Sequence, residues 1–71
     1  MYYEIWDRET SNMIGNLETA HDAALSLRDI NDVNPDAYDW LVMGIVSDDD
    51  QIIDMFDGDE LRAWVEKKLN G

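Results

Sequence analysis

The sequence contains no cysteine, a single proline and only five basic residues. Without cysteine, neither a disulfide framework nor a thiolate metal site can form, which is typical of proteins from a reducing cytoplasm. No apolar run approaches the roughly 20 residues that a transmembrane helix requires. The opening residues Met1 to Ile5 contain no basic segment followed by an apolar one, so we expect no secretory signal and a cytoplasmic location.

The shortage of basic residues leaves seventeen acids unbalanced, and the net charge is −12. Direct binding to nucleic acid needs a basic footprint that this chain lacks. Anionic membrane surfaces are disfavoured for the same reason. The charge therefore favours a partner protein with a basic surface or a divalent cation, or it serves solubility alone.

The chain nevertheless has 45% hydrophobic residues and three tryptophans, which predicts a folded domain rather than a disordered segment. Its length predicts a single domain over residues 1–71. Two apolar runs, Tyr38–Val46 and Gln51–Phe56, flank the polar segment Ser47–Asp50 and predict a β-hairpin. The first run is apolar on both faces, as in an interior strand, whereas the second is mixed and suits an edge.

A second hairpin is predicted at the start of the chain, with strands over residues 2–6 and 13–17 around a polar turn. Alternation places Tyr3 and Ile5 on one face of the first strand. The opposite face carries Tyr2, Glu4 and Trp6. In the return strand, alternation groups Met13, Gly15 and Leu17 on one face, and a glycine inside a strand indicates a bulge or a close backbone approach.

Two helices complete the pattern. Thr19 is the predicted N-cap of the first, which should end near Asn31 or Asp32 because Pro35 restricts the residue before it. The second helix should follow Asp57 or Asp59, with Lys67 and Lys68 in its last turn. Apolar stripes support both helices, over Ala20, Ala23, Ala24, Leu27 and Ile30 in the first and over Leu61, Trp64, Val65 and Leu69 in the second.

The element order predicts an α+β fold of ββαββα type, a four-stranded, mainly antiparallel sheet with two helices packed on one face. The second face of such a sheet would carry exposed apolar side chains, which in a small protein mark an interface. A homodimer through this face is one way to cover it, and the residues predicted for that contact are Tyr2, Trp6 and Ile14.

The opening segment resembles a group of short uncharacterised bacterial proteins. The residues that carry the resemblance are Tyr3-Glu4-Ile5-Trp6-Asp7-Arg8-Glu9-Thr10, then Asn12, Ile14-Gly15, Thr19 and Ala23-Ala24-Leu25. Those proteins begin with a similar Trp-Asp-x-Glu-Thr hairpin followed by an alanine-rich helix. The resemblance covers about the first third of the chain and implies a bacterial or phage origin, without implying an activity.

Patterns for catalysis and for cofactor binding are weak. His21 is the only histidine and has no cysteine to activate, so we predict a surface residue and no enzyme. Four scattered glycines do not form a phosphate-binding loop, and no cofactor is expected. The acids around 48–60 do not match the spacing of an EF-hand calcium loop in any register, so we predict no metal site.

The distribution of the acids is the strongest functional signal. Eleven acids and no lysine or arginine lie between Arg28 and Arg62. A face of one sign attracts a cationic partner and can imitate the phosphates of a nucleic acid. We therefore expect a non-enzymatic protein-binding module, an inhibitor or regulator that engages the basic surface of a nucleic-acid-binding protein. We expect the contact acids to gather on one side of the fold, and they are Asp32, Asp36, Asp39, Asp48, Asp49, Asp50, Asp54 and Asp57.

Two alternatives stay open at this point. In the first, the chain is a self-associating accessory domain, a homodimer whose acids only keep it soluble. In the second and weaker one, it binds a divalent cation.

Overall fold

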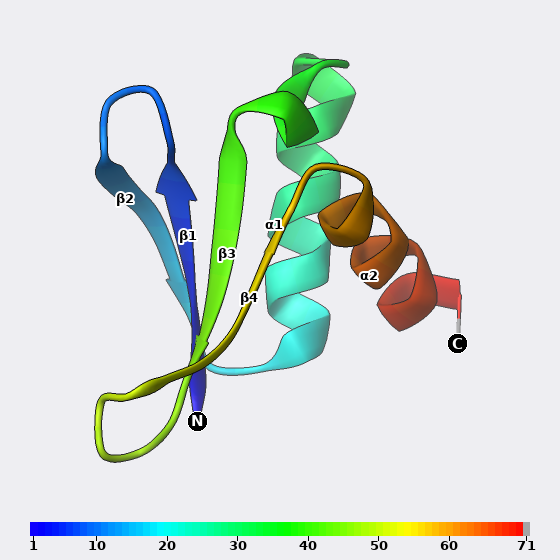
Figure 1. Ribbon diagram of the computed structural model, residues 1–71. Helices are drawn as coiled ribbons and strands as arrows, with labels where there is room; N and C mark the ends of the chain where they lie inside the picture. The colour runs from blue at the N-terminus through cyan, green and yellow to red at the C-terminus, as the bar shows by residue number, and fades with distance from the viewer. Residues whose placement is uncertain (71) are drawn as a thin grey trace.

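The computed structural model describes residues 1–70 and places six main elements in the predicted ββαββα order (Figure 1). The chain forms β1 (Tyr2–Asp7), β2 (Asn12–Leu17), α1 (Ala20–Val33), a short 3-10 helix η1 (Ala37–Asp39), β3 (Leu41–Val46), β4 (Ile52–Asp57) and α2 (Gly58–Asn70). The predicted α+β class is confirmed. Gly71, the last residue of the predicted domain, lies outside the described residues.

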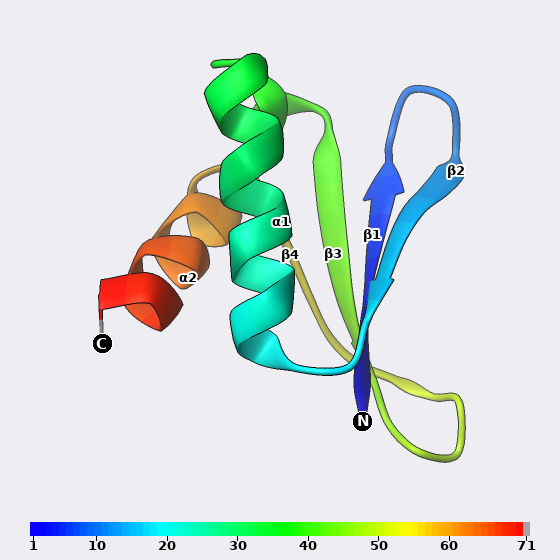
Figure 2. The same cartoon turned by 180° about the vertical axis from the view of Figure 1, so that it is seen from behind.

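The four strands form one antiparallel sheet in the order β2-β1-β3-β4. The predicted interior strand, β3, pairs with β1 and β4, and the predicted edge strand, β4, does lie at an edge. Pairing of β1 with β3 joins the two hairpins and sets Glu4 opposite Gly44. Both helices lie on the same side of this sheet (Figure 2).

A bulge in β2 changes one predicted face. Gly15 pairs with Ile5 on the helix side, but the register then shifts and Met13 pairs with Trp6 on the other side. The predicted grouping of Met13 with Gly15 is therefore wrong, because one extra residue in the strand reverses the alternation beyond it. Gly15 also allows close packing, since a Cβ there would lie 3.3 Å from Leu17 Cδ2.

Helix α1 is capped by a side chain at its start and by a backbone hydrogen bond at its end. The Asp22 amide donates to Thr19 Oγ1 at 3.1 Å, as the N-cap prediction requires. The helix ends at Val33, one residue beyond the predicted end, and the Asn34 amide donates to the Ile30 carbonyl at 2.9 Å. Asn34 itself is extended, as expected for the residue before Pro35.

The segment just before β3 is not a strand. Tyr38, predicted at the start of the apolar strand run, lies instead in η1, where the Trp40 amide donates to the Ala37 carbonyl at 3.0 Å. The Tyr38 ring is only 4% exposed, with the Arg62 guanidinium 5.0 Å from its centre. Burial of this ring beneath α2 outweighs the strand propensity of tyrosine.

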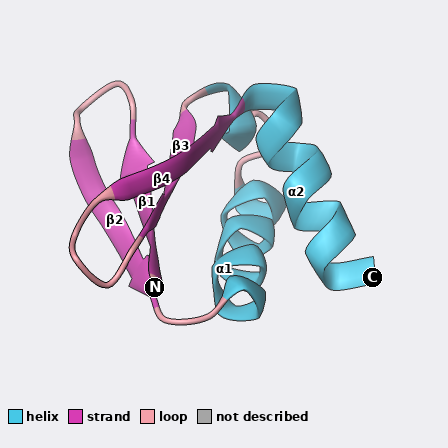
Figure 3. Ribbon diagram, turned by 60° about the horizontal axis from the view of Figure 1, so that its bottom comes forward, coloured by secondary structure: helices cyan, strands magenta, loops and turns pink. Residues whose placement is uncertain are grey.

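The core lies between the sheet and the helices (Figure 3). The Trp64 ring lies 6.0 Å from that of Tyr3 and 6.1 Å from that of Phe56, so aromatic contacts join α2 to β1 and β4. The largest fully buried side chains are Ile5, Leu27, Leu41, Met43 and Leu61. The fold is therefore one layer of helices on one sheet, and the other side of the sheet carries no helix.

Candidate functional site

The side of the sheet that faces away from the helices is the candidate surface, and we call it the open face. Three of its apolar side chains are exposed, at 46% for Met13, 58% for Ile52 and 54% for Met55, whereas Val46 on the same face is only 2% exposed. Strand alternation and register assign to it Tyr2, Glu4, Trp6, Met13, Val42, Gly44, Val46, Ile52, Met55 and Asp57.

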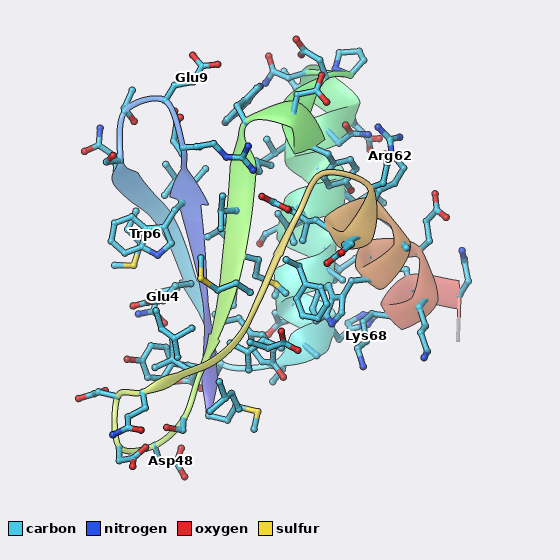
Figure 4. All side chains as sticks on the ribbon, viewed as in Figure 1. Glu4, Trp6, Glu9, Asp48, Arg62 and Lys68 are labelled. Carbon is cyan, nitrogen blue, oxygen red and sulfur yellow. The ribbon has the colours of Figure 1, made fainter. Side chains whose placement is uncertain are left out.

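Glu4 and Trp6 project from the middle of this surface. Figure 4 shows both side chains leaving β1 on the side away from α1 and α2. Tyr3 and Ile5, which alternate with them, point into the core. The predicted division of β1 into two faces is thus confirmed, and it places an aromatic ring and a carboxylate two residues apart on the open face.

A hollow of about 350 Å³ opens beside these two side chains. One row of the sheet explains its position, because Glu4 pairs with Gly44 and Gly44 pairs with Met55. Gly44 supplies no side chain to fill the space between its neighbours, and a Cβ there would meet nothing within 4 Å. The hollow is lined by Glu4, Trp6, Asp7, Arg8, Ser11, Val42, Ile52 and Met55.

Charges at one end of the hollow are already paired. Arg8 Nη2 lies 2.5 Å from Asp57 Oδ2. The Asp7 carboxylate accepts from the backbone amides of Glu9 at 2.8 Å and Thr10 at 3.3 Å. Within residues 1–70, by contrast, the half-buried Glu4 carboxylate has neither an ion-pair nor a hydrogen-bond partner.

The three acids of the β3–β4 turn have contacts within the fold. Asp48 pairs with the Met1 ammonium group, and Ser47 Oγ donates to Asp49. The Tyr2 hydroxyl donates to Asp50 Oδ1 at 2.9 Å, and this hydrogen bond is the main reason that the pKa of Tyr2 is raised. Asp48 and Asp50 are thus exposed but bonded to the first two residues of the chain, whereas Asp49 is bonded within its own turn.

The structure divides the predicted acidic set between the two ends of the sheet (Figure 1). Asp36 and Asp39 precede β3 and lie near its start, whereas Asp48 follows its end. Six strand residues separate the two groups by about 20 Å. The expectation that all eight acids gather on one side is therefore wrong, because β3 carries the chain from one end of the sheet to the other between them.

The remaining predicted acids lie elsewhere. Asp32 is near the end of α1, Asp54 is in the middle of β4, and Asp57 ends β4 in its ion pair with Arg8. Of the three residues predicted for a dimer contact, Tyr2 and Trp6 lie on the open face, and Ile14 is exposed at the bulge of β2.

Basic residues are placed unevenly between the two layers. Arg28, Arg62, Lys67 and Lys68 belong to the helices, so Arg8 is the only base of the two hairpins. The hairpins hold eight carboxylates, those of Glu4, Asp7, Glu9, Asp48, Asp49, Asp50, Asp54 and Asp57. The sheet layer is therefore the more negative side of the protein.

A second hollow, of about 280 Å³, lies between α1 and α2. It is lined by Arg28, Asn31, Tyr38, Arg62, Val65, Glu66, Leu69 and Asn70. Burial is the main reason that the pKa of Tyr38 is raised, and the nearby Arg62 opposes this shift. Glu66 brings a carboxylate beside the two guanidinium groups, so this hollow has no single charge preference.

The remaining sequence predictions concern His21, metal binding and membrane-spanning helices. His21 is exposed on the first turn of α1, as predicted. Among residues 1–70, no three acidic or histidine side chains are grouped so that they could hold a metal ion. Neither helix in this range has the length and apolar character that crossing a membrane would require.

The chain matches no protein-family model, no curated protein and no solved structure. The resemblance of its first third to short bacterial proteins stays a prediction.

Sequence reasoning missed the hollow beside Glu4. Alternation in β1 already grouped Glu4 with Trp6, but the lining residues Val42, Ile52 and Met55 come from β3 and β4. Strand order decides that these residues meet.

Proposed function

We propose that this chain is a non-enzymatic protein-binding module whose open face and β3–β4 turn contact the basic surface of a partner protein. The observation that carries the proposal is the open face itself, an exposed apolar surface in a sheet layer with eight carboxylates and one arginine. Apolar contacts supply affinity in such interfaces, and the surrounding charge selects the partner and speeds association.

The partner class that best fits this charge is a nucleic-acid-binding protein, and the chain would then act as its inhibitor or regulator. Such proteins present cationic surfaces to phosphates. Carboxylates from the β3–β4 turn would compete for these surfaces, and the apolar open face would add contacts that nucleic acid cannot make. The acids before β3 are left outside this contact, since they lie at the other end of the sheet.

A homodimer through the open face is the second candidate, because the same exposed apolar side chains can cover each other. Each copy carries a net charge of −12, which opposes self-association at low salt. Light scattering at low and at high salt separates the two functions: a monomer at both favours the partner protein, and a dimer favours self-association.

Capture of partners from a bacterial lysate tests the first proposal. The immobilised protein should retain a basic protein that elutes at about 0.5 M salt, where electrostatic reach falls to a few ångströms. Duplex DNA added to the lysate should compete with this capture. The variant D48N/D49N/D50N should lose the partner, and a control with equal charge loss on the helices, D22N/D29N/E66Q, should keep it.

Three results would count against the proposal. They are equal capture by both triple variants, retention of the partner at 0.5 M salt, and no effect of DNA on the capture.

A further inference from the structure

The open face holds an unpaired carboxylate, that of Glu4, in a hollow whose lining is partly apolar. Glu4 is half-buried and lies beside the apolar side chains of Trp6, Ile52 and Met55. A carboxylate that is partly shielded from water is stabilised by a cationic or hydrogen-bonding partner. Within residues 1–70 Glu4 has no such partner, so its position suits a cation that comes from outside the chain.

The neighbouring aromatic ring favours the same kind of ligand. Trp6 is two residues from Glu4 on the same face of β1, a spacing of about 6.6 Å along the strand. The face of an indole ring attracts cations, and tryptophan does so more strongly than the other aromatic residues. A planar cation lying on Trp6 would therefore be within reach of the Glu4 carboxylate.

The other charges of the hollow do not reverse this preference. Arg8 is the only base of the lining, and its guanidinium is paired with Asp57 at 2.5 Å. Asp7 adds a second lining carboxylate, so the hollow together with Asp57 is negative. The net charge of −12 further raises the local concentration of cations.

We propose that this hollow binds an arginine side chain of the partner protein, with the Trp6 indole stacked on the guanidinium and the Glu4 carboxylate paired with it. This proposal rests on the proposed function and names the group that the open face recognises. Arginine fits better than lysine because its planar guanidinium can stack on an aromatic ring and bind a carboxylate through two hydrogen bonds. The guanidinium is also less strongly hydrated than the lysine ammonium group, so it loses less hydration free energy when it enters the hollow.

A second copy of the chain is a poorer source of this arginine. Arg28 and Arg62 belong to the helical layer, and Arg8 is already paired on the open face. A second copy would also add a further net charge of −12. A basic partner protein brings arginine and opposite charge together.

Nuclear magnetic resonance of the full chain with short peptides tests the proposal. The probes are the capped peptides hexa-arginine and hexa-lysine, added to the ¹⁵N-labelled protein. We expect hexa-arginine to shift the indole N–H signal of Trp6 but not those of Trp40 and Trp64, together with backbone amides of the lining residues. We expect hexa-lysine to bind more weakly at the same place.

The variant E4Q should weaken hexa-arginine binding about tenfold, since it removes a charge-assisted hydrogen-bond acceptor. E9Q is the matched control, because it removes the same charge from the exposed β1–β2 turn outside the hollow, and it should change the affinity less than twofold. The variant W6L should also weaken binding, and its thermal melting shows whether it is folded.

Several outcomes would overturn the proposal. They are equal binding by E4Q and E9Q, an unchanged Trp6 indole signal, equal affinity for the two peptides, and a peptide-independent dimer that hides the Trp6 signal. If E4Q still captures the lysate partner as well as the original chain does, the arginine site is wrong while the protein-binding function stands. If hexa-arginine binds as expected but the lysate yields no salt-sensitive partner, the proposed function fails and the site remains.

Discussion

Arg8 Nη2 lies 2.5 Å from Asp57 Oδ2, which joins the turn of the first hairpin to the junction between β4 and α2. Both side chains are about half exposed, at 49% and 57%. The Arg8 amide also donates to the Trp40 carbonyl at 2.8 Å, so the backbone holds this turn independently of the ion pair.

We therefore expect the Arg8–Asp57 ion pair to stabilise the fold only slightly. A double-mutant cycle with R8Q and D57N, followed by urea unfolding, should give a coupling free energy below about 1 kcal/mol. The coupling should fall further at high salt. A coupling above about 2 kcal/mol would show that this pair is a main support of the sheet.

The two strand glycines should respond in opposite ways to alanine. G44A adds a methyl group where nothing lies within 4 Å and should stabilise the fold by about 0.5–1 kcal/mol, because glycine loses more chain entropy on folding. G15A brings its methyl group 3.4 Å from Cδ1 of the fully buried Ile5. It should destabilise the fold by about 1 kcal/mol.

Thermal melting of G44A and G15A tests this prediction, and each variant is the control for the other. At about 4 °C per kcal/mol, the two melting temperatures should lie on opposite sides of that of the original chain. Shifts of the same sign would contradict the assigned faces of β2 and β3.

Alkaline pH should reveal the buried position of Tyr38. Burial raises the pKa of Tyr38 above its ordinary value of 10.0, so the neutral phenol is favoured in the folded state. This contribution to stability is complete below pH 10 and is lost as the pH rises through the folded-state pKa.

The measurement for Tyr38 is the melting temperature between pH 8 and pH 12. We expect Y38F to lose less stability than the original chain above pH 10, because phenylalanine cannot ionise. The control Y3F removes another phenol, one that packs against Trp64. Parallel curves for Y38F and the original chain would mean that ionisation of Tyr38 is not coupled to unfolding.

Added monovalent salt should stabilise the protein, since it screens the mutual repulsion that accompanies a net charge of −12. We expect the melting temperature to rise as sodium chloride increases from 0.02 M to about 0.5 M, at which the screening length is a few ångströms. The variant D48N/D49N/D50N carries less charge and should show a smaller rise. A melting temperature that does not change with salt would rule out self-repulsion as a significant term.

Much of the fold could be predicted from local patterns. Thr19 and Pro35 bound the first helix, and the stripe from Leu61 to Leu69 defines the second, because capping and helical periodicity depend on nearby residues. The apolar run Tyr38–Val46 indicated an interior strand, although the strand itself begins only at Leu41. The strand register was harder to predict, because the bulge that turns Met13 to the open face appears only in the pairing of β2 with β1.

The candidate site was predicted only in part. Tyr2 and Trp6 were assigned to an uncovered sheet face by alternation alone. The hollow between Glu4 and Met55 was not, because it depends on pairing between β1, β3 and β4. The acids at 36–39 and 48–50 are close in sequence, yet the intervening strand separates them.

The amino-acid sequence by itself determined the order of elements, the faces of β1 and the excess of negative charge, since these follow from periodicity and composition. Only the tertiary structure decided that Glu4, Gly44 and Met55 form one row, that Tyr38 is buried in a 3-10 turn, and that the acids lie at two ends. The physical reason is that strand pairing and side-chain packing join residues far apart in the chain, and no local preference encodes which of them meet.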